Sequence, residues 1–163
     1  MFSRKDFSGG LKSSFPIVAG YLPVGFAFGV AAEGVQAGTL AAVFTSIFIY
    51  AGASQFALVG LLKDGVPILS AALITLGLNI RHLLYGPGLS RDTEEFSLRE
   101  RLVAAFGLTD EVFAVAFSRI GTMSRESRFW WLMGLEFGAY LSWFGGTIAG
   151  TSAEICCSVT ILY

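Results

Sequence analysis

Long stretches of the sequence carry no charged side chain. The run 13–32 has none, and neither has the run 34–62. A helix needs about 20 mostly apolar residues to cross the hydrocarbon core of a bilayer. We expect such runs to form membrane-spanning helices, because a soluble domain needs a charged surface that they cannot supply. The runs show no period-two alternation of the kind that membrane strands require.

The composition indicates a membrane protein. Hydrophobic residues make up 54% of the 163 residues and charged residues 14%, against about 25% charged residues in globular domains. The net charge of -1 leaves no basic excess for binding nucleic acid. Cys156 and Cys157 are adjacent, a spacing that fits neither a disulfide framework nor a metal site. We predict an all-α, polytopic transmembrane helical bundle surrounded by the lipid bilayer.

Apolar segments divide the chain into one transmembrane domain, 1–163, with about five spans, some broken or re-entrant. The segments are 13–32, 37–62, 65–90, 102–118 and 129–153, and they follow a cytoplasmic N-terminus, 1–12. The first segment is longer than the apolar core of a signal peptide, and further spans follow it. We therefore interpret it as a retained span.

Lysine and arginine predict the orientation, because cytoplasmic loops carry an excess of them. With five crossings and the N-terminus inside, seven lie in the cytoplasm and three outside. The cytoplasmic set is Arg4, Lys5, Lys12, Lys63, Arg119, Arg125 and Arg128, and the external set is Arg91, Arg99 and Arg101. Segment 34–62 is long for one crossing, and if it is re-entrant, every later loop changes side.

Polar residues inside the apolar segments are candidates for function, because an unsatisfied polar group in hydrocarbon costs several kcal/mol. The first group is Gly52, Ala53, Ser54 and Gln55. Small residues with a hydroxyl and a carboxamide can open a helix, and the freed backbone groups can bind a substrate. Alternatively, Gly52 is a helix-packing contact and Ser54 bonds the carbonyl four residues before it.

The second group extends from Asn79 through Arg81, His82 and Tyr85 to a Gly-Pro-Gly sequence, 86–88, that is expected to end the helix. In an α-helix Asn79 and His82 share a face, and Arg81 and Tyr85 are i,i+4 neighbours. One interpretation is that Arg81 holds a carboxylate and His82 relays a proton. The other is that Arg81 marks a helix end and that His82 and Tyr85 form an interfacial belt.

The third group is Thr109, Asp110 and Glu111. Consecutive helical residues point in different directions. We expect one acid to pair with a cation such as Arg81, and the other to line a cavity or take a proton. Alternatively, Thr109 or Asp110 caps a new helix, and 102–108 is a short half-helix.

Glu136 is the fourth candidate, either as a proton carrier or as an ion-pair partner that orders the bundle. Trp130, Trp131 and Trp143 in the same segment are of the type found in interfacial belts. Glycines recur at four-residue spacing at 25 and 29, at 134 and 138, and at 146 and 150. This spacing favours close helix packing.

No soluble-enzyme motif is present, and we predict no catalytic residue and no cofactor. His82 has no second histidine or cysteine at ligand spacing, so no metal site is expected.

Several of these polar runs resemble the AzlC-type branched-chain amino acid permease family. The matching stretches are 10–16, 20–29, 50–56, 78–86 and 106–113, within a resemblance that covers about residues 8–150. The run Ala51-Gly-Ala-Ser-Gln-Phe56 and the pattern Asn79-x-Arg-His-x-x-Tyr85 are the most specific. The resemblance implies the large subunit of a gradient-driven exporter in the bacterial cytoplasmic membrane. It also implies a small multi-span AzlD-type subunit as partner.

We therefore expect a branched-chain amino acid to bind near the midplane, with Arg81 or a helix N-terminus at its carboxylate. The substrate-binding set is Gly52, Ser54, Gln55, Asn79, Arg81 and Tyr85, and the proton-coupling or ion-pair set is His82, Asp110, Glu111 and Glu136. The tail 151–163 does not resemble the family, so we expect a C-terminally truncated permease. The rival hypotheses are an inactive permease and a structural or assembly subunit that transports nothing.

Overall fold

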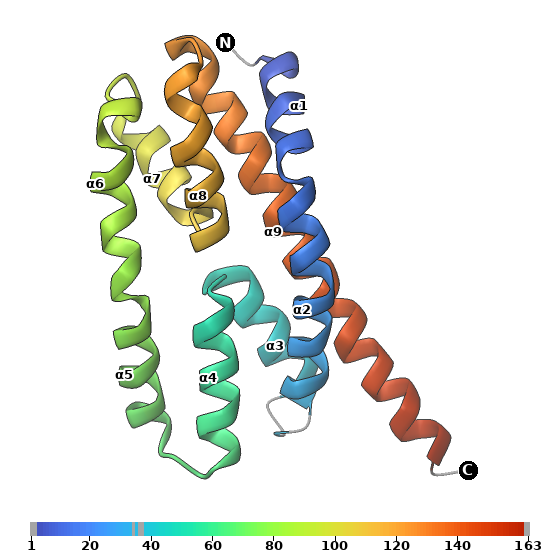
Figure 1. Ribbon diagram of the computed structural model, residues 1–163. Helices are drawn as coiled ribbons and strands as arrows, with labels where there is room; N and C mark the ends of the chain where they lie inside the picture. The colour runs from blue at the N-terminus through green and yellow to red at the C-terminus, as the bar shows by residue number, and fades with distance from the viewer. Residues whose placement is uncertain (1–2, 34, 36–37, 162–163) are drawn as a thin grey trace. The chain divides into compact units, whose positions relative to one another are not determined.

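The computed structural model describes residues 3–33, 35 and 38–161, with side chains for 3–33, 35 and 39–153. Every secondary-structure element within these ranges is a helix, which confirms the all-α prediction (Figure 1). Residue 37, where the second predicted segment begins, and the side chains of Cys156 and Cys157 lie outside the described residues. The helices are α1 (Arg4–Ser13), α2 (Phe15–Glu33), α3 (Gly38–Phe48), α4 (Gly52–Lys63), α5 (Ile68–Leu78), η1 (Asn79–Leu84), α6 (Tyr85–Leu89), η2 (Ser90–Thr93), α7 (Leu98–Gly107), α8 (Asp110–Arg119), η3 (Ile120–Thr122) and α9 (Arg125–Ile161).

The chain divides into two compact units. Unit 1 comprises Met1–Ala19 and Arg81–Tyr140, and unit 2 comprises Gly20–Ile80 and Leu141–Tyr163. The helices α2 and α9 each contribute to both units. All contacts described below lie within one unit or the other.

Two helical stretches of the described residues are long and apolar enough to cross a bilayer. They are α2, with 19 residues, and the continuous stretch Ile68–Thr93, with 26. Only 11% of the apolar window in the second stretch is buried, and so large an apolar surface requires lipid or another protein around it. The helix α9 is longer, at 37 residues, but its glycines, tryptophans and Glu136 make it less apolar.

The second predicted segment is broken. It forms α3 and α4, helices of 11 and 12 residues, and the chain reverses direction between them (Figure 1). At 1.5 Å per residue each is only about 16–18 Å long, too short to cross a hydrocarbon core of about 30 Å. The second predicted segment is therefore two short helices that turn back on each other, and not one long helix.

The fourth predicted segment is also broken, into α7 and α8, each of 10 residues. Thr109 caps α8, because its side chain accepts a hydrogen bond from the N–H of Val112. This confirms the capping alternative for Thr109. At the start of α7, hydrogen bonds from the backbone N–H and the hydroxyl of Ser97 lower the pKa of Glu100 and complete a capping box.

Residues 79–84 form a 3₁₀-helix, η1, where an α-helix was expected. With three residues per turn, Asn79 and His82 still share a face. The prediction that Gly86-Pro87-Gly88 ends the helix is wrong, because α6 passes through these residues. Pro87 is the third residue of α6, close to its junction with η1.

Glycines bring α2 and α9 close together in unit 2. A Cβ added at Gly25 would lie 2.7 Å from the carbonyl oxygen of Trp143, and one added at Gly146 would lie 2.6 Å from that of Leu22. Each helix thus packs its glycine against the backbone of the other. The predicted glycine faces at 25 and 146 are therefore helix contacts.

A similar contact joins α1 to α9 in unit 1. A Cβ added at Gly138 would lie 2.9 Å from the Cβ of Ser14, and one added at Gly134 would overlap the backbone carbonyl of Phe7. Ser14 is 1% exposed. The glycines of α9 therefore hold α1 against its first half.

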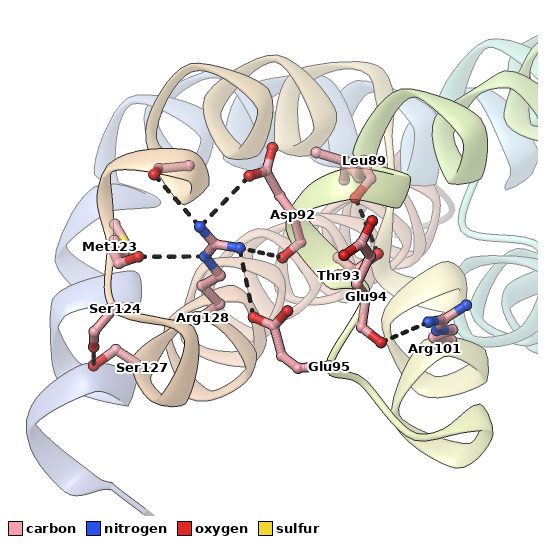
Figure 2. Close-up of polar contacts among 11 residues, drawn as sticks. Leu89, Asp92, Thr93, Glu94, Glu95, Arg101, Met123, Ser124, Ser127 and Arg128 are labelled. Carbon is pink, nitrogen blue, oxygen red and sulfur yellow. Dashed lines mark hydrogen bonds and ion pairs between the residues drawn. The ribbon is translucent and has the colours of Figure 1, made fainter.

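Contacts of Arg128 within unit 1 contradict the predicted sides of two charged segments. The five-crossing assignment places 91–101 outside and 119–128 in the cytoplasm. In the structure Arg128 donates to the backbone carbonyl of Asp92 at 3.1 Å, and its guanidinium lies 3.6 Å from the Asp92 carboxylate and 3.5 Å from that of Glu95 (Figure 2). Residues in direct contact lie on one side of a membrane. These contacts do not agree with an assignment in which segment 102–118 separates the two charged segments.

Candidate functional site

The break between α3 and α4 in unit 2 leaves backbone groups outside the helical hydrogen-bond pattern. Tyr50 has a φ of 42°, in the left-handed region that bulky residues rarely adopt, and such a conformation costs about 1–3 kcal/mol. Ala51 precedes α4 and gives it no side-chain cap. The first N–H groups of α4 therefore have no acceptor within the helix, and they form the positive end of its dipole.

Gln55, in the second turn of α4, is buried at this break. Its side chain is 1% exposed. The Nε2 group donates to the hydroxyl of Thr45 at 3.2 Å and to that of Ser46 at 3.1 Å. The Oε1 atom is also buried and has no hydrogen-bond partner among the described residues. Burying a hydrogen-bond acceptor without a donor costs free energy. The Oε1 atom therefore identifies a place where a ligand can supply the missing donor.

A chain of hydroxyl groups fixes the orientation of the Gln55 amide. Thr45 and Thr147 donate their protons to backbone carbonyls of their own helices, each at 3.0 Å. Ser46 lies 2.9 Å from the hydroxyl of Thr147 and is therefore the donor in that pair. No hydroxyl proton is left for Gln55, so its amide must present N–H groups to the hydroxyls. The carbonyl oxygen of Gln55 consequently points away from these hydroxyl groups, and no described residue donates a hydrogen bond to it.

Aromatic side chains enclose the start of α4. The ring of Trp143 would lie 2.7 Å from a Cβ at Gly52, and it stacks on Phe28 and meets Tyr21 edge-on, with ring centroids 6.0 and 5.5 Å apart. Trp143 is 3% exposed, so its ring is buried within the protein. Its indole Nε1 is a buried donor that no described residue accepts from.

Ser54 links α4 to the end of α5. Its hydroxyl donates to the Oδ1 atom of Asn79 at 2.5 Å, and Ser54 is 1% exposed. This bond excludes the alternative in which Ser54 bonds its own helix. The predicted residues Gly52, Ser54, Gln55 and Asn79 therefore come together in unit 2.

A second polar cluster lies in unit 1, where α8 begins. Arg81 and Asp110 form an ion pair with Nη1 and Oδ2 2.5 Å apart, and the Tyr85 hydroxyl donates to the other carboxylate oxygen of Asp110. The expected pairing of an acid with Arg81 is thus found. The ring of His82 contacts that of Tyr85, with centroids 5.0 Å apart. The side chains of Arg81 and Asp110 are 42% and 45% exposed, so this pair is open to its surroundings.

The two remaining acids differ sharply in environment. Glu111 is exposed on the first turn of α8, whereas Glu136 is 5% exposed within α9. Three residues that shape the unit 2 site were not predicted from the sequence: Thr45, Ser46 and Thr147. Hydroxyl residues inside an apolar segment were the available signal, but serine and threonine often bond only their own helix in membranes.

Comparisons with known proteins show which family the chain belongs to. A family model described as AzlC protein matches residues 16–154. The chain is 43% identical over 148 residues to the inner membrane protein YgaZ of Escherichia coli K12, covering 88% of this chain and 59% of that protein. It is 44% identical over 147 residues to an uncharacterized membrane protein of Archaeoglobus fulgidus, covering 90% and 62%. It is 25% identical over 154 residues to the branched-chain amino acid transport protein AzlC of Bacillus subtilis, covering 92% and 60%.

The chain thus spans about three fifths of the length of these relatives. No solved structure matches it. The family model covers most of the chain, including both breaks and all ten candidate site residues. The chain belongs to the AzlC family of membrane proteins.

Proposed function

We propose that this chain transports branched-chain amino acids and that the break between α3 and α4 in unit 2 binds them. The observation that carries the proposal is the buried, oriented and unpartnered carbonyl of Gln55 beside an uncapped helix N-terminus. Non-helical backbone at membrane depth persists only where protein or a polar cavity surrounds it. Discontinuous helices in transporters use such ends to bind substrates.

The groups at this break match the two charges of an amino acid. An α-ammonium group needs acceptors, and Gln55 Oε1 is one to which no described residue donates. An α-carboxylate needs donors, which the first N–H groups of α4 and the indole of Trp143 supply. Aromatic rings of Phe28, Tyr21 and Phe56 provide apolar surface nearby for a branched side chain. In this assignment the carboxylate rests on the helix N-terminus, and Arg81 is engaged with Asp110.

The resemblance and the name of the Bacillus relative support a branched-chain substrate. We propose export as the direction and a small AzlD-type subunit as the partner, as the resemblance implies. The bacterial cytoplasmic membrane is the proposed location, in keeping with the Escherichia relative's name. The proposed activity is transport and includes no enzymatic step.

We further propose that α2, the stretch Ile68–Thr93 and α9 cross the membrane, while the pairs α3–α4 and α7–α8 each return to the side from which they start. With a cytoplasmic N-terminus, nine of the 11 lysines and arginines are then cytoplasmic and Lys63 is external, with Arg81 inside a crossing helix. This asymmetry is sharper than the seven-to-three division of five crossings.

Cysteine labelling tests this topology. After Cys156→Ser and Cys157→Ser, single cysteines are introduced by Asp64→Cys and Glu94→Cys, both at exposed positions. In intact cells a membrane-impermeant maleimide should label the cysteine at 64 and reach the one at 94 only after permeabilisation. Five crossings predict the reverse at both positions, and that result would exclude the proposed topology.

Transport by a Gln55→Ala variant tests the proposed site. In proteoliposomes the parent should exchange labelled leucine across the membrane, and the variant should lose at least about 90% of that rate, because a buried hydrogen bond to a charged group is worth about 1.5–3 kcal/mol. Thr75→Ala is the matched control, since the Thr75 hydroxyl bonds only carbonyls of its own helix. A Gln55→Ala rate equal to that of Thr75→Ala would refute the site.

A further inference from the structure

Glu136 is a carboxyl group buried among backbone and apolar groups in unit 1. It lies in α9 and is 5% exposed. The last residue of α7, Gly107, packs directly on it: a Cβ added there would lie 2.5 Å from the carboxyl carbon of Glu136. Glycine at 107 therefore creates the space that the carboxyl group fills.

Within the part of the chain that the structure describes, Glu136 forms no ion pair. Its Oε1 atom is buried and has no hydrogen-bond partner there. An ionised carboxylate in such surroundings lacks any compensation for its lost hydration, whereas a protonated carboxyl group is neutral. The ion-pair interpretation of Glu136 has no cation to support it, and the environment favours the form that carries a proton.

The charged groups on the neighbouring elements are occupied or exposed. On α7, Arg101 donates to the carbonyl oxygens of Phe96 and Glu94, and Arg99 and Glu100 precede it in the first turn. On α1, Lys12 is exposed. On α9 itself, Tyr140 lies one turn further along, with its ring against Phe106. At the start of α8, Asp110 is paired with Arg81 and Glu111 is exposed.

A cavity of about 300 Å³ within unit 1 is lined in part by residues of α7 and α9, the two helices that meet at Glu136. Its lining includes Ser90, Thr93 and Arg101, polar residues that adjoin the charged segment 91–101, and also Leu108 and Leu132. Leu108 directly follows Gly107, and Leu132 precedes Glu136 by about one helical turn. The lining of the cavity therefore includes residues of the polar segment, the residue after Gly107 and a residue one helical turn before Glu136.

We propose that Glu136 is the proton-binding residue that couples amino-acid transport to the proton gradient, and that protons reach it through this cavity. The proposal rests on the proposed function and identifies its coupling ion. A neutral carboxyl group can remain buried while the protein changes state, and its proton can leave only when water reaches the group. Of the other candidate acids, Asp110 is paired with Arg81 and Glu111 is exposed, so neither is a carboxyl group that is both buried and outside an ion pair.

Transport by Glu136→Gln in proteoliposomes tests the coupling. Glutamine has the shape of the protonated carboxyl group, so leucine–leucine exchange should stay within about twofold of the parent, while accumulation driven by a pH gradient should be lost. Glu126→Gln, at an exposed acid of the same helix, should retain both activities. Proton-driven accumulation by Glu136→Gln at the parental level would overturn the proposal.

A labelling measurement tests the same site without transport. A protonated carboxyl group adds across a C=N bond of a hydrophobic carbodiimide to give an O-acylisourea. In an apolar site its acyl group shifts from oxygen to nitrogen, and mass spectrometry locates the stable N-acylurea. Glu136 should be modified in the purified protein, faster at lower pH, and Ala105→Trp should slow the modification by filling the cavity that Ala105 lines. Absence of modification at Glu136 would overturn the proton site, whereas failure of the parent to exchange leucine would overturn the proposed function.

Discussion

Replacing Arg128 with alanine should lower the free energy of unfolding by about 3 kcal/mol or more, because removing one member of a buried ionic network leaves the others uncompensated. Arg128 is 9% exposed. Its guanidinium donates to the carbonyl oxygens of Asp92, Met123 and Gly121 at 3.1, 3.3 and 3.4 Å, and it also faces the carboxylates of Asp92 and Glu95 (Figure 2). One side chain thus joins η2, η3 and the start of α9.

Thermal unfolding in detergent measures this effect. Arg125→Ala is the matched control: it removes an exposed arginine from the same turn of α9 and should change stability by less than about 0.5 kcal/mol. Arg128→Lys should recover only part of the loss, because an ammonium group cannot reach five acceptors with the planar geometry of a guanidinium. Equal stability of Arg128→Ala and Arg125→Ala would contradict the role of this network.

A single methyl group at Gly25 or Gly146 should destabilise the protein by about 1–3 kcal/mol, the usual cost of overpacking. The added Cβ would lie 2.7 or 2.6 Å from a backbone carbonyl of the facing helix. Backbone cannot move aside as a flexible side chain can, so α2 and α9 must separate. Separation would also disturb Trp143, whose carbonyl is the group that Gly25 contacts.

The neighbouring glycines supply controls of the same chemistry. A Cβ at Gly20 in α2 or at Gly145 in α9 meets nothing within 4 Å. Gly20→Ala and Gly145→Ala should therefore be neutral or stabilising by up to about 1 kcal/mol, since alanine favours helix. Melting of all four variants in one detergent makes the comparison. Equal Tm values for Gly145→Ala and Gly146→Ala would exclude close packing of α2 on α9.

The sequence predicted the helical class and the positions of the breaks through simple physics. Uncharged runs of span length require lipid, and new helices begin at the polar residues predicted to interrupt the apolar segments, α4 at Gly52 and α8 at Asp110. The sequence does not show whether the chain turns back or crosses the membrane after each break. A reversal between α7 and α8 and a crossing through both have the same hydropathy, and only contacts such as that of Arg128 with Asp92 distinguish them.

The sequence identifies polar residues at depth by their type, but it does not show which of them contact one another. Gln55 was selected as a polar group at depth, but the hydroxyls that orient it come from Ser46 and Thr147, 101 residues apart in sequence. Such a chain of donors depends on tertiary packing and leaves no local pattern. The sequence predicted one role for Glu136, Asp110 and Glu111. Only the structure shows that Glu136 differs from the other two, because it is buried against Gly107.

Direct binding of leucine to the purified chain tests the central claim, that the α3–α4 break in unit 2 is an amino-acid site. Isothermal titration calorimetry of the parent in detergent should show saturable binding, with isoleucine and valine competing. Gln55→Ala should weaken the affinity at least about tenfold, or about 1.4 kcal/mol, while Thr75→Ala should bind as the parent does. Unchanged affinity in Gln55→Ala, or no binding to the folded parent, would contradict the assignment.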